Sequence, residues 1–166
     1  MKKVCYFIKT VWDVFTSYFL GQGLVILILC VLYSTALVFI IGKFGILIGI
    51  LVGLLSIVPY LGFTVGLVIS IIIAAIQHHD FLHVFYVILA FALIQILESF
   101  FITPKIVGKS VGINPFVVLG LLIVGGMAFG PLGMLISVPA AGVLIKIYRD
   151  RVKKAESEVI VAPPAE

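Results

Sequence analysis

Long uninterrupted apolar stretches dominate the chain and predict membrane-spanning helices. Residues 23–41 contain no charge and would form a helix of about 28 Å, enough to cross the hydrocarbon core of a bilayer. A second full-length span is predicted over residues 83–101. Shorter apolar stretches occupy residues 44–58, 63–76, 116–129 and 132–148. The pattern therefore predicts an all-α integral membrane protein.

Each pair of shorter stretches is separated by a turn that contains proline and glycine. The first turn holds Pro59 and Gly62, and the second holds Gly130 and Pro131. Proline lacks an amide donor and ends helices. Irregular backbone at membrane depth is tolerated only inside protein or beside a water-filled cavity. Two interpretations follow: the turns lie within the membrane and line a pathway, or they are ordinary turns at its surface.

The order of these stretches occurs twice along the chain, as a long span, a short segment, a proline turn and a short segment. The first copy is residues 23–76 and the second is residues 82–148. Aligning LVGLLSIVP with IVGGMAFGP pairs Pro59 with Pro131 at an offset of 72 (131 minus 59). Each copy crosses the membrane an odd number of times, whether its short segments span or form a re-entrant hairpin. The sequence therefore predicts two inverted repeats, each a long transmembrane helix plus a pair of short helices around a proline turn.

The two ends differ from this membrane domain, residues 23–148. Over residues 1–22, apolar side chains at positions 8, 11, 12, 15, 18 and 19 have helical spacing and are mixed with lysines. This predicts an amphipathic helix at the membrane interface, and the alternative is a helix packed on a partner protein. Residues 149–166 are predicted to be a basic and then disordered tail.

Composition and charge agree with a lipid environment. The chain is 63% hydrophobic and 11% charged, whereas soluble domains have roughly 45–50% apolar and about 25% charged residues. Its excess cations flank apolar spans, so we expect no nucleic-acid partner. The predicted topology places ten of the eleven Lys and Arg residues on the side of the two termini, and only Lys43 on the other. By the positive-inside rule, both termini are expected in the cytoplasm.

Glu98 is the most informative single residue. A charged side chain at the middle of a membrane helix costs about 2.5–3.5 kcal/mol, so such residues usually serve ions or substrates. Gln95 lies one helical turn earlier on the same face. We expect Glu98 to bind a coupling cation or proton, with Gln95 adding a neutral oxygen ligand. The alternative is a structural ion pair between Glu98 and Lys105 or Lys109.

The glycines Gly45, Gly49 and Gly53 recur every four residues and line one face of a helix. Small residues at this spacing let a neighbouring backbone approach closely. The structural interpretation is tight helix packing, and the functional one is a hairpin that slides or opens.

Two further polar clusters predict no cofactor or metal site. The cluster His78, His79, Asp80 and His83 lies where a polar connector between apolar segments is expected anyway. Gly108-Lys109-Ser110 is not a phosphate-binding loop, since that motif requires another glycine at the position of Thr103.

The connector after Glu98 carries a family resemblance. It reads ESFFITPKIVGKSVGINP and resembles the E…PKI-x-GKSVGLHP signature of the autoinducer-2 exporter family of bacterial transporters, with Ile113-Asn114 in place of the usual Leu-His. The segments YFLGQ, SIVPYLG and SVP also fit. The connector positions singled out by the resemblance are Pro104, Lys105, Gly108, Lys109, Ser110, Gly112, Asn114 and Pro115. The chain is similar to the C-terminal half of family members.

The resemblance implies an oligomeric secondary transporter in the inner membrane of a bacterial cell. It would export a small signalling molecule or exchange Na⁺ and H⁺, either as a homo-oligomer or with a partner chain. The alternative is a non-transporting membrane subunit or remnant that needs a partner to supply the missing N-terminal half. We do not expect an enzyme, because no nucleophile–base pair or metal-ligand set is visible in the sequence.

Overall fold

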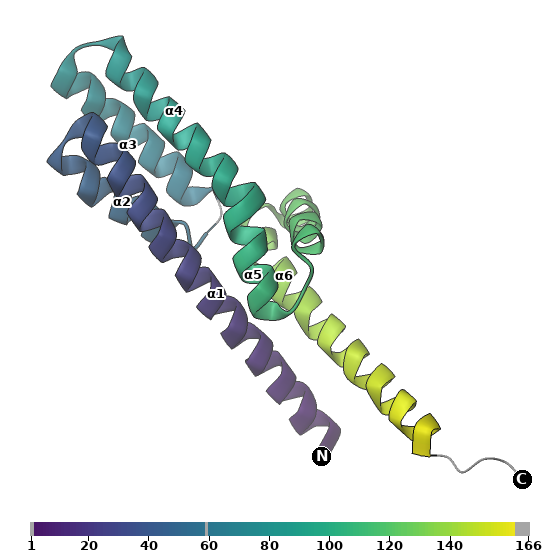
Figure 1. The fold of residues 1–166 in the computed structure, drawn as a ribbon. Helices are drawn as coiled ribbons and strands as arrows, with labels where there is room; N and C mark the ends of the chain where they lie inside the picture. Colours follow the sequence, from purple (N-terminus) through teal and green to yellow (C-terminus); the bar gives the residue numbers. More distant parts are fainter. Residues whose placement is uncertain (1, 59, 162–166) are drawn as a thin grey trace, which may run out of the picture.

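The computed structural model describes residues 2–58 and 60–161, and the side chains of residues 5–58 and 60–152. The described part is all-helical and has no strand, as predicted. Four of its helical stretches are long and apolar enough to cross a membrane, Cys5–Ile41, Leu61–His78, Phe81–Val111 and Pro115–Val152. The elements are α1 (Lys2–Ile41), α2 (Lys43–Leu55), α3 (Leu61–His78), α4 (Phe81–Leu97), a π-helical turn (Glu98–Ile102), α5 (Thr103–Val111) and α6 (Pro115–Val161) (Figure 1).

Helix α1 is one continuous helix of 40 residues, without a break near residue 22 (Figure 1). The prediction of a separate helix over residues 1–22 is therefore wrong as a division of the backbone. The change near residue 22 is one of hydropathy, and a helix can continue through such a change without altering its backbone. The position of the first 22 residues relative to a bilayer stays a prediction.

Helix α2 runs back along α1, and the glycine stripe Gly45, Gly49 and Gly53 lies directly against it. A Cβ atom added at Gly45 would be 2.3 Å from the Leu37 carbonyl carbon, and one at Gly49 would be 2.2 Å from the Ser34 amide nitrogen. The Ser34 hydroxyl donates to the Ile46 carbonyl at 3.1 Å across the same contact. Glycine is needed here because the two backbones leave no room for a side chain.

The upper part of the molecule in Figure 1 is a bundle of α1 to α4. Its centre is the Phe91 ring on α4, whose centroid lies 4.8 Å from that of Tyr33 and 5.9 Å from that of Phe63. Many large apolar side chains on the outside of the helices remain exposed. Apolar side chains on the outer surface are expected of a protein that is surrounded by lipid.

The connector that follows Glu98 is mostly helical, and not the irregular segment that its polarity suggests. Helix α4 passes through the π-helical turn into α5, which has Pro104 in its first turn and ends at Gly112 in the left-handed region (φ 74°). The turn lies directly before Pro104, whose ring clashes with the carbonyl four residues earlier in a regular α-helix. The Asn114 side chain then accepts a bond from the Phe116 amide at 2.9 Å and caps α6 at Pro115.

Helix α6 is two helices joined at a sharp turn. Phe129 and Gly130 have non-helical backbone angles, and Pro131 follows, as the sequence predicts. Gly130 (φ 62°, ψ −146°) has almost the same conformation as Gly42 between α1 and α2 (φ 63°, ψ −145°). Both hairpins therefore turn through a glycine with similar backbone angles. Pro59 lies outside the described residues, so the predicted repeat at an offset of 72 stays a prediction.

The C-terminal stretch remains helical to Val161, where the sequence predicts disorder after the basic residues. Residues 149–161 are rich in Arg, Lys, Glu and Ala, which favour helices, and the first proline comes only at position 163. Residues 162–166 lie outside the described residues.

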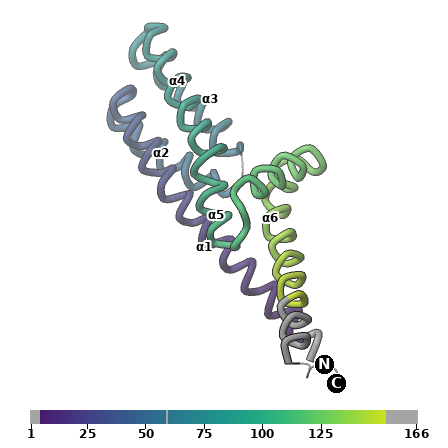
Figure 2. The backbone as a smooth tube through the Cα atoms, turned by 45° about the vertical axis from the view of Figure 1, so that its right-hand side comes forward, coloured from purple at the N-terminus to yellow at the C-terminus, as the bar shows by residue number. Residues whose placement is uncertain are grey.

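The start of α1 and the second half of α6 lie together. The Tyr6 hydroxyl donates to Asp150, and Lys146 pairs with Asp13 at 3.1 Å, so the start of α1 runs beside the second half of α6 (Figure 2). The α1–α2 and α3–α4 turns lie at the opposite end of the elongated molecule (Figures 1 and 2). The α5–α6 turn is on the side of the termini, because Arg149 donates to the Gly112 carbonyl at 3.1 Å.

Candidate functional site: a polar cavity beside the π-helical turn

A cavity of about 90 Å³ lies where three irregular segments of the backbone approach one another. Tyr60 reaches it from the α2–α3 turn, Glu98 from the π-helical turn, and Met134 from just after the break in α6. The full lining is Tyr18, Gln22, Tyr60, Gln95, Glu98, Ser99, Thr103, Leu119, Leu122, Ile123 and Met134.

Glu98 is the charged residue of this lining. It is the first residue of the π-helical turn, and its carbonyl accepts the i+5 bond from the Thr103 amide. The described side chains form two ion pairs, His83 with Asp80 and Lys146 with Asp13, and Glu98 belongs to neither. Lys105 and Lys109 are exposed and do not line this cavity, so the structural ion pair considered from the sequence is not observed.

The other polar side chains that line this cavity are neutral. Gln95 donates to the Ser99 hydroxyl at 3.1 Å, while its own carbonyl oxygen is buried and has no hydrogen-bond partner among the described residues. The buried Tyr33 hydroxyl likewise has no hydrogen-bond partner among the described residues. Carboxylate and amide oxygens are the ligands that hard cations prefer, and a carboxylate also binds a proton. The arrangement can therefore hold a proton or a small cation.

Two buried residues of α1 also line the cavity. Tyr18 is 3% exposed, and Gln22 is 4% exposed. The Gln22 amide donates to the Ser56 carbonyl at 3.2 Å and so ties α1 to the turn that carries Tyr60. Sequence reasoning missed both as cavity residues. A glutamine at the edge of an apolar span was the available signal, because such a residue rarely faces lipid.

The structure separates the connector motif from Glu98. Pro104 and Gly108 are buried in packing contacts, and a Cβ on Gly108 would lie 2.9 Å from the Ile113 carbonyl oxygen. Gly112 ends α5 and Asn114 caps α6, so both have local structural roles. Lys109, Ser110 and Gly112 line a different hollow, between α1, α5 and α6.

The histidine cluster forms the turn between α3 and α4. Asp80 accepts a bond from the His83 amide at 3.0 Å, and its carboxylate also contacts the His83 ring at 2.8 Å. The His83 amide, followed by the His83 ring, holds the pKa of Asp80 below its ordinary value. The rings of His78 and His83 are stacked with centroids 3.7 Å apart. No group of three or more His, Cys, Asp or Glu side chains in the described part of the chain is arranged to hold a metal.

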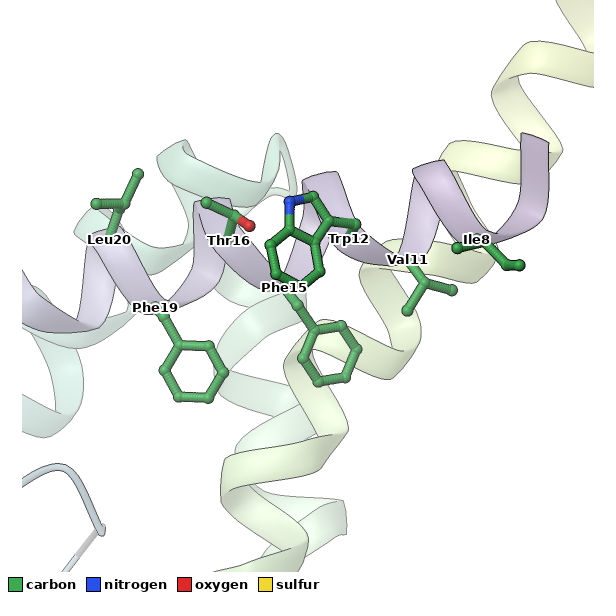
Figure 3. A pocket seen from close by; sticks show the side chains of 7 residues that line it. All are labelled: Ile8, Val11, Trp12, Phe15, Thr16, Phe19 and Leu20. Atoms are coloured by element: carbon green, nitrogen blue, oxygen red, sulfur yellow. The ribbon is translucent and has the colours of Figure 1, made fainter. Parts of the chain in front are cut away.

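Another hollow lies elsewhere and is apolar. It has a volume of about 650 Å³ on the outer face of α1 (Figure 3). Its walls are Ile8, Val11, Trp12, Phe15, Thr16, Phe19 and Leu20. It is distant in sequence from Glu98 and offers only the Thr16 hydroxyl and the Trp12 ring nitrogen as polar groups (Figure 3). This face suits lipid or another apolar helix, and not a polar substrate.

Comparison with known proteins identifies a family and several relatives that match most of the chain. The family described as "AI-2E family transporter" matches residues 1–153. The chain is 31% identical over 138 residues to "Putative transport protein YrrI" of Bacillus subtilis (strain 168), a match that covers 83% of this chain and 38% of that protein. It is 35% identical over 136 residues to "Putative transport protein sll0063" of Synechocystis sp., covering 80% of this chain and 32% of that protein.

A third relative is "AI-2 transport protein TqsA" of Escherichia coli (strain K12). It is 28% identical over 119 residues, which cover 72% of this chain and 34% of that protein. The matches thus span about a third of the length of these curated relatives. No solved structure matches the chain significantly.

Proposed function

The chain belongs to the AI-2E transporter family, and from that premise we propose that it forms the ion-coupling part of a secondary transporter in the bacterial inner membrane. In this proposal Glu98 binds a proton or Na⁺ in the cavity beside the π-helical turn, and Gln95 adds a neutral oxygen ligand. The transport direction and any larger substrate belong to the complete assembly, since the matches cover between 32% and 38% of the relatives named above.

One observation carries the proposal, namely a partly buried carboxylate in a membrane helix without a cationic partner among the described side chains. An ionised carboxylate in such a place is costly unless a cation or proton neutralises it. A carboxylate that gains and loses such a ligand as the cavity opens to each side is the basic element of ion coupling.

Cavity size supports an ion over an organic substrate. Pockets that bind drug-sized molecules have about 300–1,000 Å³, whereas one water needs about 10–15 Å³ of accessible space. The cavity of about 90 Å³ suits several waters or a partly hydrated ion. A signalling molecule is the second candidate, because the relative TqsA is named an AI-2 transport protein. It would require a more open conformation than the one described.

The test combines ion binding with flux. Purified wild-type protein should bind Na⁺ or release protons on binding it, and in liposomes should show flux that depends on pH or Na⁺. Glu98→Gln keeps the size of the side chain and should abolish both dependences while the protein still expresses and folds. Asp80→Asn is the matched control, because it also removes one carboxylate but lies at the exposed α3–α4 turn. Wild-type pH dependence in a well-folded Glu98→Gln protein would remove Glu98 from the coupling mechanism.

We also propose that the chain has an inverted-repeat topology with both termini in the cytoplasm. The side-by-side ends of α1 and α6, with the α5–α6 turn on the same side, support the common side for the termini and the connector. The distribution of ten of eleven Lys and Arg residues supports the orientation. Cysteines placed at Ser110 and His79 should react with impermeant reagents from opposite sides of intact cells. Labelling of both from one side would contradict this topology.

The second candidate function is a membrane subunit that does not transport alone. The short span of the matches relative to the relatives favours it. A second polypeptide that co-purifies with the chain and is required for flux would support this function, whereas flux from the purified chain alone would exclude it.

A further inference from the structure

A second hollow, of about 380 Å³, lies on the side of the termini between the start of α1, the end of α5 and the second half of α6. Three basic side chains line it, Lys109 from α5 and Lys146 and Arg149 from α6. Two acidic side chains, Asp13 and Asp150, also line it. The lining therefore has a net formal charge of +1, three cations against two carboxylates, and a hydroxyl donor in Ser17.

The two carboxylates are already engaged. Asp13 pairs with Lys146 at 3.1 Å, and Asp150 accepts a bond from the Tyr6 hydroxyl. Arg149 uses one of its nitrogens for the Gly112 carbonyl at 3.1 Å, which leaves other N–H donors of its guanidinium for a ligand. Lys109 is exposed and takes part in neither of the two ion pairs among the described side chains. Lys109 and Arg149 are thus the groups that remain for an anion.

The surroundings indicate the depth of this hollow. Tyr6 and Trp12 on α1, and Tyr148 on α6, are exposed aromatic residues on the same stretches of helix. Tyrosine and tryptophan concentrate at the level of the lipid headgroups, because their rings are apolar and their tips are polar. The hollow also has apolar walls, including Val14, Val111 and Ile145. Cationic donors beside apolar walls at headgroup level match a phosphate group attached to acyl chains.

We propose that this hollow binds the phosphate of an anionic phospholipid headgroup, with Lys109 and Arg149 as its principal donors. Arginine binds phosphate oxygens through two parallel N–H bonds, and lysine adds a compact charge. A bound lipid would link α1, α5 and α6, whose direct contacts here include the Lys146–Asp13 pair and the Arg149–Gly112 bond. This site is separate from the Glu98 cavity and does not depend on the proposed transport function.

The test measures lipid binding to the purified chain in detergent by native mass spectrometry. Phosphatidylglycerol is compared with phosphatidylcholine, which has the same phosphate but no net charge. We expect a clear preference for phosphatidylglycerol, and a loss of about fivefold in affinity in Lys109→Gln, as expected for the removal of one basic residue near a membrane surface. Arg149→Gln should lose at least as much, since it removes the forked donor.

Lys105→Gln is the matched control, because Lys105 is one turn from Lys109 on the same helix, is also exposed and does not line the hollow. It should keep wild-type affinity. An equal loss in Lys105→Gln, or no preference between the two lipids, would overturn the site. A second arm adds millimolar inorganic phosphate or glycerol phosphate. Displacement of the lipid by either one would overturn the lipid assignment and assign the site to a free phosphate compound.

Discussion

The glycine stripe of α2 gives the sharpest test of the packing. In Gly49→Ala, the new Cβ would lie 2.2 Å from the Ser34 amide nitrogen and 2.5 Å from its hydroxyl oxygen. Backbone cannot move aside as a side-chain tip can, so α1 and α2 must separate by roughly an ångström to reach ordinary contact distances. The separation also stretches the Ser34–Ile46 hydrogen bond, now 3.1 Å.

The expected cost follows from these contacts. Overpacking of a tight interior costs about 1–3 kcal/mol, and a lost hydrogen bond adds about 0.5–1.5 kcal/mol. Alanine regains about 0.5–1 kcal/mol over glycine through its lower chain entropy in a helix. The net change is a destabilisation of about 0.5–4 kcal/mol, with its middle at about 2 kcal/mol. For a chain of this size, about 2 kcal/mol corresponds to a decrease of about 4–8 °C in Tm.

The assay is thermal unfolding of the purified protein in one detergent, compared with Gly23→Ala. Gly23 is also in a helix, but a Cβ there meets nothing within 4 Å. This control should be as stable as wild type or more so, by up to about 1 kcal/mol. A Gly49→Ala protein that melts with the control would show that α1 and α2 do not pack as described.

Two further predictions concern the turns. Gly130→Ala should lower Tm by several degrees, because the Gly130 backbone (φ 62°, ψ −146°) has a conformation essentially confined to glycine. Other residues in this conformation are strained by about 1–3 kcal/mol. Gly120→Ala in the same helix should not lower Tm, since a Cβ there meets nothing within 4 Å. The pKa of Asp80 is lower in the folded protein than in the unfolded chain. The ionised Asp80 carboxylate therefore stabilises the fold fully at pH values above its pKa in the unfolded chain, and this stabilisation is lost as the pH falls through its pKa in the folded protein. Asp80→Asn keeps the helix cap but cannot titrate, and its thermal stability should therefore fall less than that of wild type on acidification; an identical acid profile would contradict the assignment.

Hydropathy predicted where the apolar helices lie because lipid imposes a simple rule on the chain. It failed where the helical backbone continues through polar residues. The polar residues Lys105 to Ser110 suggest a connector, yet the backbone continues as α5. The first 22 residues likewise suggest a separate helix, yet they form part of α1. In both places the hydropathy changes along the sequence, whereas the hydrogen-bonded helical backbone continues through the change.

The site was predictable only in part, for a similar reason. Glu98 and Gln95 could be predicted from the sequence, because polar groups in an apolar span are costly and usually have a functional role. Tyr18 and Tyr60 reach the same cavity from other helices and turns, and no local pattern indicates this. Nor did any local pattern indicate that Gly42 and Gly130 would have nearly the same backbone angles at their turns.

Some polar residues that line the cavity form hydrogen bonds that stabilise the fold, whereas the Glu98 carboxylate forms none with the described residues. Irregular backbone within a membrane must be satisfied by protein or water, and each unsatisfied group there costs several kcal/mol. Gln22 meets this need by bonding the Ser56 carbonyl, and Gln95 and Ser99 bond each other beside the π-helical turn. The Glu98 carboxylate makes no hydrogen bond or ion pair with the described residues. Its removal should therefore leave stability unchanged or raise it, so a Glu98→Gln protein that is stable but has lost ion dependence separates function from fold. A clear loss of stability in Glu98→Gln would instead assign the carboxylate to the fold.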